Sequence, residues 1–284
     1  MSDLLTIPFN KIRSEGNYKE ILEALERGFS KFGIDFYLVG ATARDVWMRG
    51  VHDKPPKRAT SDIDFGIMIK DSYVFDELKN YLIEEEGFVP YKENAFVLIW
   101  KDKTQVDLIP FGELEKEGVA TVRGTGFTSM NVEGFKEVFE QASEEIQTEE
   151  MQFKVCTLSG IVILKLIAWD DRPEMRGDDI DDIADIIKNY FHFNSDAIYE
   201  HHNDLFGDDD LDEIASQYLG REIGKIISKS EKLITRVKGI LEKGLSDSDS
   251  NNLDELLARE SDETIDYSRS LISHILAGIK ETTD

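Results

Sequence analysis

The sequence predicts an α+β protein, in which an N-terminal α/β domain with a mixed sheet (residues 1–157) precedes a helical C-terminal domain (residues 158–284). Three observations predict it. Apolar and polar residues alternate over residues 62–69, as in a half-buried strand. A hairpin pattern follows within residues 95–110. Beyond residue 157 the apolar residues recur at helical spacing to the end of the chain.

Composition predicts a soluble globular chain with room for two cores. The chain has 284 residues, of which 40% are hydrophobic and 32% charged. It carries 33 Lys and Arg against 58 Asp and Glu, a formal net charge of −25. Such a charge repels polyanions and excludes a protein that coats DNA non-specifically. A local basic site for a nucleotide or for one nucleic-acid end stays open, and any single carboxylate is most simply a solvated surface group.

The compartment predicted from the sequence is the cytoplasm. Cys156 is the single cysteine, so no internal disulfide can form and a reducing environment is expected. Met1–Thr6 shows no basic region leading into an apolar run, so no signal peptide is expected there. The most apolar run, Leu158–Trp169, contains Lys165 and is too short to span a bilayer, so no membrane association is expected.

The N-terminal domain is expected to open with helix, strand and helix. A helix over 17–33 ends at Gly33, a short strand covers 35–39, and Gly40 turns the chain into a second helix over Thr42–Arg49. Residues 51–60 show no periodic pattern and are expected to form a loop. The remaining elements expected before residue 157 are the strand at 62–69, a helix at 74–86, strands at 95–100 and 105–110, a helix near 133–142 and further strands.

The C-terminal domain is expected to be all helical. The predicted helices cover 158–170, 179–191, about 195–205, 211–227, 229–243, and 252–280 with one break. The acidic runs at 208–213 and 247–251 lack the glycine and glutamate of a calcium-binding EF-hand loop, so both are expected to lead into helices. His192, His201 and His202 lack zinc-ligand spacing, and His52 and His274 are isolated in the sequence.

Three aspartates carry the sharpest chemical signal. Asp62 and Asp64 are two residues apart on the predicted strand, so both side chains point to the same face. Asp107 alternates in the same way with Val106 and Leu108 on a later strand that can lie beside it. Three converging carboxylates suit a two-metal site for phosphoryl displacement. For Asp62 and Asp64 alone, the simpler alternative is that they are solvated acids on an edge strand.

A turn and a buried lysine add to this signal. Gly40 stands between a strand and a helix, where free N–H groups suit a triphosphate, although a plain turn explains such a glycine equally. Lys165 lies in a helix that is apolar on all sides, so it either snorkels to the surface or meets an anion. Arg172 follows seven residues later, near the same helical face.

In these residues the chain resembles the nucleotidyltransferase superfamily of DNA polymerase β and the tRNA CCA-adding enzymes. It is most similar to the AbiEii-type nucleotidyltransferases, known as toxins of toxin–antitoxin and phage-defence systems. The similarity rests on four motifs in order: Gly40-x-Thr42, Arg58-x-Thr60-x-Asp62-Ile63-Asp64, Val106-Asp107, and a stretch from Lys165 through Arg172 to Asp178, Asp179 and Asp182. It covers residues 35–190 and leaves 195–284 without a counterpart.

The resemblance implies a polymerase β-like fold and a metal-dependent transfer of NMP from an NTP to an acceptor hydroxyl, with the cleft between the two domains. It implies two Mg²⁺ or Mn²⁺ ions on Asp62, Asp64 and Asp107. The nucleotide would be held by Gly40, Ala41, Thr42, Arg44, Arg58, Lys165 and Arg172, with Asp178, Asp179 and Asp182 in support. Its implied partners are the NTP, a macromolecular acceptor (a tRNA 3′ end ahead of a protein hydroxyl) and, for a toxin, an antitoxin.

The sequence departs from the family pattern in two places. Ala41 stands where the family has a second glycine. The basic residue before the first aspartate of the fourth motif is missing, so the sequence alone leaves the register between Asp178 and Asp179 open by one residue. Two other functions fit the same residues: an antibiotic-modifying nucleotidyltransferase with a small acceptor, and a non-catalytic nucleotide-binding module. Lys54, Lys57 and Arg58 are the basic cluster nearest the proposed site.

Overall fold

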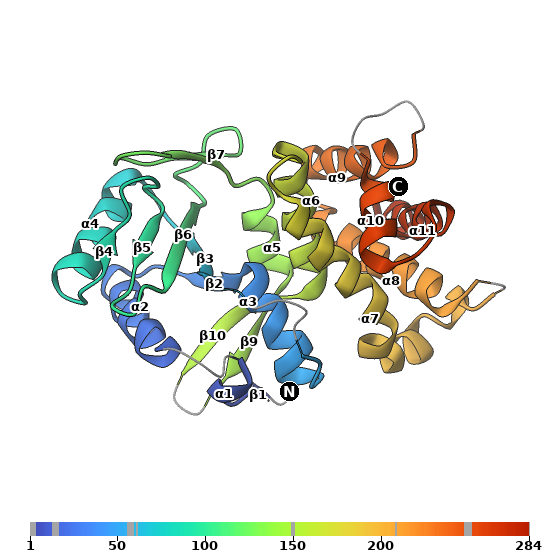
Figure 1. The fold of residues 1–284 in the computed structure, drawn as a ribbon, viewed down its shortest axis with the longest axis horizontal. Helices are drawn as coiled ribbons and strands as arrows, with labels where there is room; N and C mark the ends of the chain where they lie inside the picture. The colour runs from blue at the N-terminus through green and yellow to red at the C-terminus, as the bar shows by residue number, and fades with distance from the viewer. Residues whose placement is uncertain are drawn as a thin grey trace. The chain divides into compact units, whose positions relative to one another are not determined.

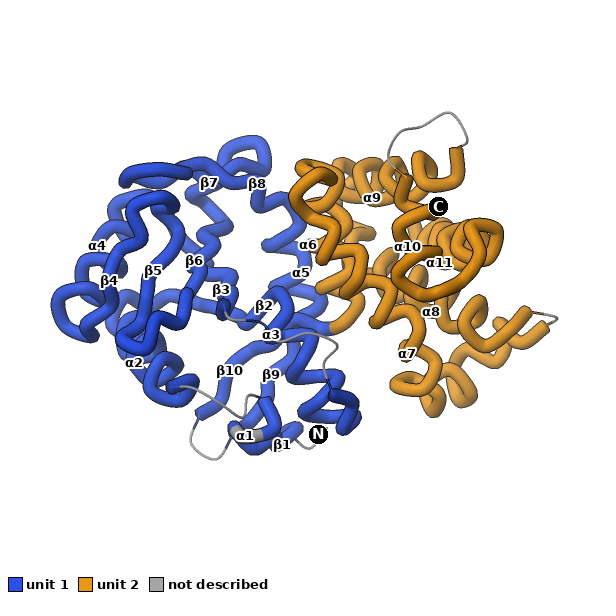
Figure 2. Tube along the Cα trace, in the orientation of Figure 1, with its two compact units in different colours: residues 1–157 blue, residues 158–284 orange. Residues whose placement is uncertain are grey.

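The computed structural model describes residues 4–12, 17–55, 60, 62–148, 151–207, 209–246 and 252–283. The chain consists of two compact units, residues 1–157 and residues 158–284 (Figure 2). The first unit is built around a sheet, and the described part of the second contains helices only (Figure 1). The predicted α+β fold class is confirmed.

The main sheet of the first unit is mixed and has eight strands in the order β1-β9-β10-β2-β3-β6-β5-β4. Its centre is the strand β3, which pairs antiparallel with β2 and parallel with β6. A separate two-stranded sheet joins β7 and β8. The strands are β1 Leu5–Thr6, β2 Phe36–Val39, β3 Asp62–Met68, β4 Val89–Pro90, β5 Val97–Ile99, β6 Gln105–Phe111, β7 Val119–Thr121, β8 Ser129–Asn131, β9 Ser143–Gln147 and β10 Gln152–Cys156.

The helices of this unit begin and end where local chemistry allows. Asp71 caps α4 by accepting hydrogen bonds from the backbone N–H groups of Tyr73 and Val74. Gly33 ends α2 in the left-handed conformation that glycine adopts without strain. The helices are α1 Phe9–Ile12, α2 Tyr18–Phe32, α3 Gly40–Asp45, α4 Ser72–Glu84 and α5 Phe135–Gln141, with a π-helical segment at Val46–Val51.

The expected helix at Thr42–Arg49 differs from the structure. The α-helical part begins at Gly40 and ends at Asp45, and the chain continues as a π-helix. The wider turn is tied to the sheet by Trp47, whose indole N–H donates to the carbonyl of Cys156 at 2.6 Å. Such an insertion depends on partners that are distant in sequence, so apolar spacing cannot reveal it.

The core of the first unit lies under β3. Ile63, Phe65 and Ile67 are fully buried on one side of this strand. At Gly66 a Cβ would stand 2.2 Å from the ring of Tyr37, so the glycine makes room for that ring. The hydroxyl of Tyr37 in turn donates to the carbonyl of Phe135 at 2.9 Å, which ties α5 to the sheet.

The second unit contains α6 Leu158–Asp171, α7 Gly177–His201, a 3₁₀ turn Asn203–Leu205, α8 Leu211–Ile227, α9 Glu231–Lys243, α10 Leu253–Ser261 and α11 Ile265–Thr283. The two helices expected at 179–191 and 195–205 are one, because no glycine or proline interrupts α7. Asp210 and Glu213 form a capping box at the start of α8, as expected for the acidic run there. None of the described helices combines the length and the apolar run needed to cross a bilayer.

Glycines bring α8 and α11 into close contact. A Cβ at Gly220 would stand 2.1 Å from the carbonyl oxygen of Ile275, and one at Gly278 would stand 2.1 Å from that of Gln217. The two backbones therefore touch where no side chain separates them. This contact fixes the arrangement of the helices around the pocket described below.

Candidate active site

The three aspartates singled out by the sequence lie on one face of the central sheet. In the parallel pairing of β3 with β6, Asp64 is opposite Asp107 and Asp62 is opposite Gln105. Neighbouring strands are about 4.8 Å apart, so Asp64 and Asp107 project side by side. All three aspartates are half-buried, whereas Ile63 and Val106, which precede Asp64 and Asp107, are fully buried on the opposite face.

Neutral donors orient two of these carboxylates. The hydroxyl of Thr60 donates to Asp62 Oδ1, and the side-chain amide of Gln105 donates to Asp107 Oδ1 at 2.8 Å. Each of these bonds leaves further lone pairs on the carboxylates. Oxygen atoms of this kind are the ligands that Mg²⁺ prefers, so the donor set fits a hard divalent cation.

The turn at Gly40 lies directly against the Asp64 carboxylate. Gly40 has a φ of +67°, and a Cβ placed there would stand 2.2 Å from Asp64 Oδ2. Val39, the residue before it, is paired with Asp64 across β2 and β3. Glycine is therefore required twice, once for the left-handed backbone and once for the space that the carboxylate occupies.

The side chains that follow Gly40 point into the packed interior. Ala41, Thr42 and Arg44 are all buried. The hydroxyl of Thr42 donates to the backbone carbonyl of Asp62 at 3.2 Å, and the guanidinium of Arg44 donates to Asp45 Oδ1. In this structure these two side chains brace the turn and β3, so the part of the turn left to meet a phosphate is its backbone.

The basic cluster expected near the site is only partly visible. Lys57 and Arg58 lie outside the described residues. Lys54 is described, and its backbone N–H donates to the carbonyl of Met48 in the π-helical segment.

In the second unit, Lys165 meets two carboxylates. Its Nζ lies 2.6 Å from Asp179 Oδ1 and 2.8 Å from Asp182 Oδ2, and the residue is only 8% exposed. Burial alone would lower the pKa of Lys165, but the two neighbouring carboxylates raise it above its ordinary value. Of the two outcomes that the sequence left open, snorkelling is wrong: the lysine meets an anion inside its own unit.

This ion pair bears on the register of the fourth motif, which the sequence leaves open between Asp178 and Asp179. Asp179 and Asp182 are buried one turn apart on α7 and share Lys165, whereas Asp178 is exposed. The burial and the shared lysine favour Asp179 and Asp182 over Asp178 as the aspartates of the motif, which stays a prediction. Arg172 does not continue the face of Lys165, because α6 ends at Asp171 and Arg172 lies in the turn beyond it.

A second group of potential metal ligands was missed by the sequence reasoning. Ligand atoms of Asp209, Glu213 and His274 all lie within 4.8 Å of one another, so the expectation that His274 is isolated was wrong. The signal is absent from the sequence because α8 and α11 are far apart along the chain. Both oxygens of Glu213 already accept hydrogen bonds, one from the backbone of Asp210 and one from Ser270. Glu213 therefore already serves in the capping box at the start of α8.

The chain is similar to known nucleotidyltransferase proteins. A family model described as "Nucleotidyl transferase AbiEii toxin, Type IV TA system" matches residues 23–273. Among curated protein sequences none matches. A solved structure titled as an antigenic nucleotidyltransferase-like protein from Paracoccidioides brasiliensis is 14% identical, with 69% of this chain and 91% of that chain covered and a TM-score of 0.38.

Proposed function

Because this chain belongs to the AbiEii nucleotidyl transferase toxin family, we propose that it transfers a nucleoside monophosphate from an NTP to an acceptor hydroxyl and releases pyrophosphate. The observation that carries the proposal is the pairing of Asp64 with Asp107 across β3 and β6, with Asp62 on the same face. Three carboxylates fixed on a buried sheet keep their positions when a ligand binds.

The three aspartates would hold Mg²⁺ or Mn²⁺. When bound, two such ions would stabilise the negative charge on the attacking and leaving oxygens. The residues of the chain do the rest. Asp107, at the edge of the group, would accept the proton of the acceptor hydroxyl. The backbone at Gly40 and Ala41 would receive the phosphates of the nucleotide beside Asp64.

Lys165 and Arg172 take a different place in this proposal from the one the resemblance implies. The two ion pairs of Lys165 support a role in holding α6 against α7 rather than direct contact with phosphate. For Arg172 and for Arg58, contact with the nucleotide stays a proposal.

We propose a macromolecular acceptor, taken at a single terminus or side chain, with tRNA 3′ ends ahead of protein hydroxyls. The net charge of −25 opposes an extended nucleic-acid groove, whereas one terminus needs few phosphate contacts. The family description names a toxin of a toxin–antitoxin system, which supports an antitoxin as a partner of this chain.

The test is a transfer assay with each α-labelled NTP and whole-cell extract, with and without Mg²⁺ or Mn²⁺. Products are separated by nuclease and protease treatment. Wild type and Glu77→Gln, an exposed acid on α4, should both transfer label to RNA or protein, and Asp62→Asn should not. Label found only in small molecules would favour an antibiotic-modifying enzyme.

A thermal melt supplies a readout that needs no acceptor. Carboxylates that share a cation repel one another without it, so Mg²⁺ or Mn²⁺ should raise the melting temperature of wild type and of Glu77→Gln. Asp62→Asn should weaken this effect while leaving the protein folded. Equal melts with and without metal in all three proteins would count against the metal site.

A further inference from the structure

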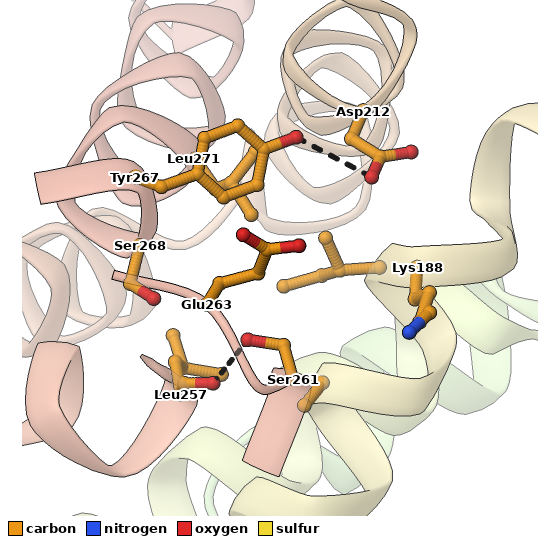
Figure 3. A pocket seen from close by; sticks show the side chains of 10 residues that line it. Lys188, Asp212, Leu257, Ser261, Glu263, Tyr267, Ser268 and Leu271 are labelled. Atoms are coloured by element: carbon orange, nitrogen blue, oxygen red, sulfur yellow. Dashed lines mark hydrogen bonds between the residues drawn. The ribbon is translucent and has the colours of Figure 1, made fainter. Parts of the chain in front are cut away.

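A pocket in the second unit belongs to no part of the proposed reaction. Residues of four helices and of the turn between α10 and α11 line it (Figure 3). One wall is apolar and consists of Ala184, Ile187, Leu257 and Leu271. An apolar wall with a few polar groups is typical of small-ligand sites.

The hydroxyl of Ser268 in this pocket is buried without a partner. Ser268 is 1% exposed, and no hydrogen-bond partner of its Oγ is found in the part of the chain that the structure describes. Figure 3 shows the hydroxyl on the side of Ser268 that faces Glu263. A buried hydroxyl left unsatisfied costs stability, so a polar group that enters the pocket and bonds to it would recover that cost.

The other polar groups of the pocket favour a cation. Asp212 and Glu263 contribute two carboxylates against the single ammonium of Lys188 (Figure 3). Tyr267 already donates its hydroxyl to Asp212 at 3.4 Å. Burial and the nearby Asp210 raise the pKa of Asp212, so its carboxylate lacks full compensation.

We propose that this pocket binds a small organic cation, an ammonium or amidinium group carried on an apolar body, with Asp212 and Ser268 as its polar contacts. Such a head group only donates hydrogen bonds. The hydroxyl oxygen of Ser268 and the carboxylates of Asp212 and Glu263 can all accept them. The apolar body packs against the apolar wall, and a bound ligand bridges helices that are distant in sequence.

The test compares three probes that share one ring: benzamidinium, benzamide and benzoate. Calorimetry with the full chain, without NTP and at physiological ionic strength, measures their affinities. Benzamidinium should bind about ten-fold more tightly than benzamide, because one charge-assisted bond is gained, and benzoate should bind least. Equal affinity for benzamidinium and benzamide would overturn the proposal.

Two substitutions locate the site. Asp212→Asn should lower benzamidinium affinity about ten-fold, whereas Glu242→Gln, which removes the same charge from an exposed position on α9, should not. Equal losses in both would show that only the net charge attracts the probe. Ser268→Ala should lower affinity about three-fold while the melting temperature stays the same or rises. A lower melting temperature with unchanged affinity would show that the hydroxyl serves the fold, and would overturn its role here.

Discussion

Two groups of aspartates in this chain look alike in sequence and differ in what surrounds them. On β3 and β6, the donors seen at Asp62 and Asp107 are a hydroxyl and an amide, both neutral. On α7, Asp179 and Asp182 share a buried lysine within 2.8 Å. The lysine-bound pair joins α6 to α7 inside the second unit, whereas the half-buried aspartates of the sheet are the ones we propose as metal ligands.

This difference predicts that substitutions in the two groups separate activity from stability. In the sheet group the loss of one carboxylate should remove the reaction and leave the fold. In the helical group the loss of the cation should damage the fold before it affects anything else. The four tests below run from the largest expected effect to the smallest.

Asp107→Asn is expected to have the largest effect. It removes one charge and the proposed proton acceptor, and nucleotidyl transfer should fall by about 1,000-fold or more. The amide can still accept the hydrogen bond from Gln105, so the free energy of unfolding should change by less than about 1 kcal/mol. The check is transfer rate beside a urea denaturation curve. Transfer within ten-fold of wild type would remove Asp107 from the site.

Lys165→Met should have the next largest effect, on stability. It keeps the apolar stem but removes the buried ammonium that Asp179 and Asp182 share, so the chain should lose about 3–5 kcal/mol. Lys229→Met, an exposed change on the same unit, should cost less than about 0.5 kcal/mol.

The pH dependence of the Lys165 pair gives a second check on the same group. Because the pKa of Lys165 is raised in the folded protein, the ion pair contributes fully to the free energy of unfolding below the ordinary lysine pKa. That contribution disappears as pH rises through the folded pKa. A stable Lys165→Met protein with weakened NTP binding would instead place this lysine on the phosphate.

Gly40→Ala should affect both stability and nucleotidyl transfer. The new Cβ would displace the Asp64 carboxylate, and a misplacement of about 1 Å can reduce a rate by about 100-fold. Gly33→Ala is the matched control, since Gly33 also has a positive φ but nothing lies within 4 Å of its added Cβ. Both variants should lose about 1–2 kcal/mol from backbone strain, and only Gly40→Ala should lose transfer. Equal transfer rates in the two variants would contradict the link between the turn and Asp64.

The smallest effect is expected at Glu86, a carboxylate with a cation near the surface. Its hydrogen bonds from Arg27, at 2.9 and 2.6 Å, lower the pKa of Glu86 below its ordinary value. The stability from this pair is therefore present above the ordinary pKa of glutamate and is lost as pH falls through the folded pKa. Glu86→Gln should cost less than about 1 kcal/mol at neutral pH and nothing in acid. Denaturation curves at several pH values check it, and a loss that persists in acid would point to packing.

The sheet group could be predicted from the sequence because strand geometry is local. Alternation along 62–69 is enough to place Asp62 and Asp64 on one face, and the same holds for Asp107. The parallel pairing that joins them needed the structure to show it. For Lys165, the sequence left two outcomes open: snorkelling to the surface, or contact with an anion. The spacing of residues along one helix carries no information about the helix packed against it.

Other features depend on contacts that no local pattern reports. The π-helical segment is tied to Cys156 through Trp47, more than a hundred residues away in sequence, and the group around His274 forms only when α11 meets α8. The continuity of α7 is a different case. Its sequence lacks a helix breaker, so the helix continues through residues 192–194, where a gap was expected.

The contact between Gly40 and the Asp64 carboxylate also constrains how this chain can evolve. Any residue larger than glycine at position 40 occupies the space of that carboxylate, so a lineage that loses the glycine loses the selective advantage of the aspartate as well. The two positions should therefore be inherited together, 24 residues apart in the chain. Relatives that retain only one of the pair are the ones in which we expect the reaction to have been abandoned.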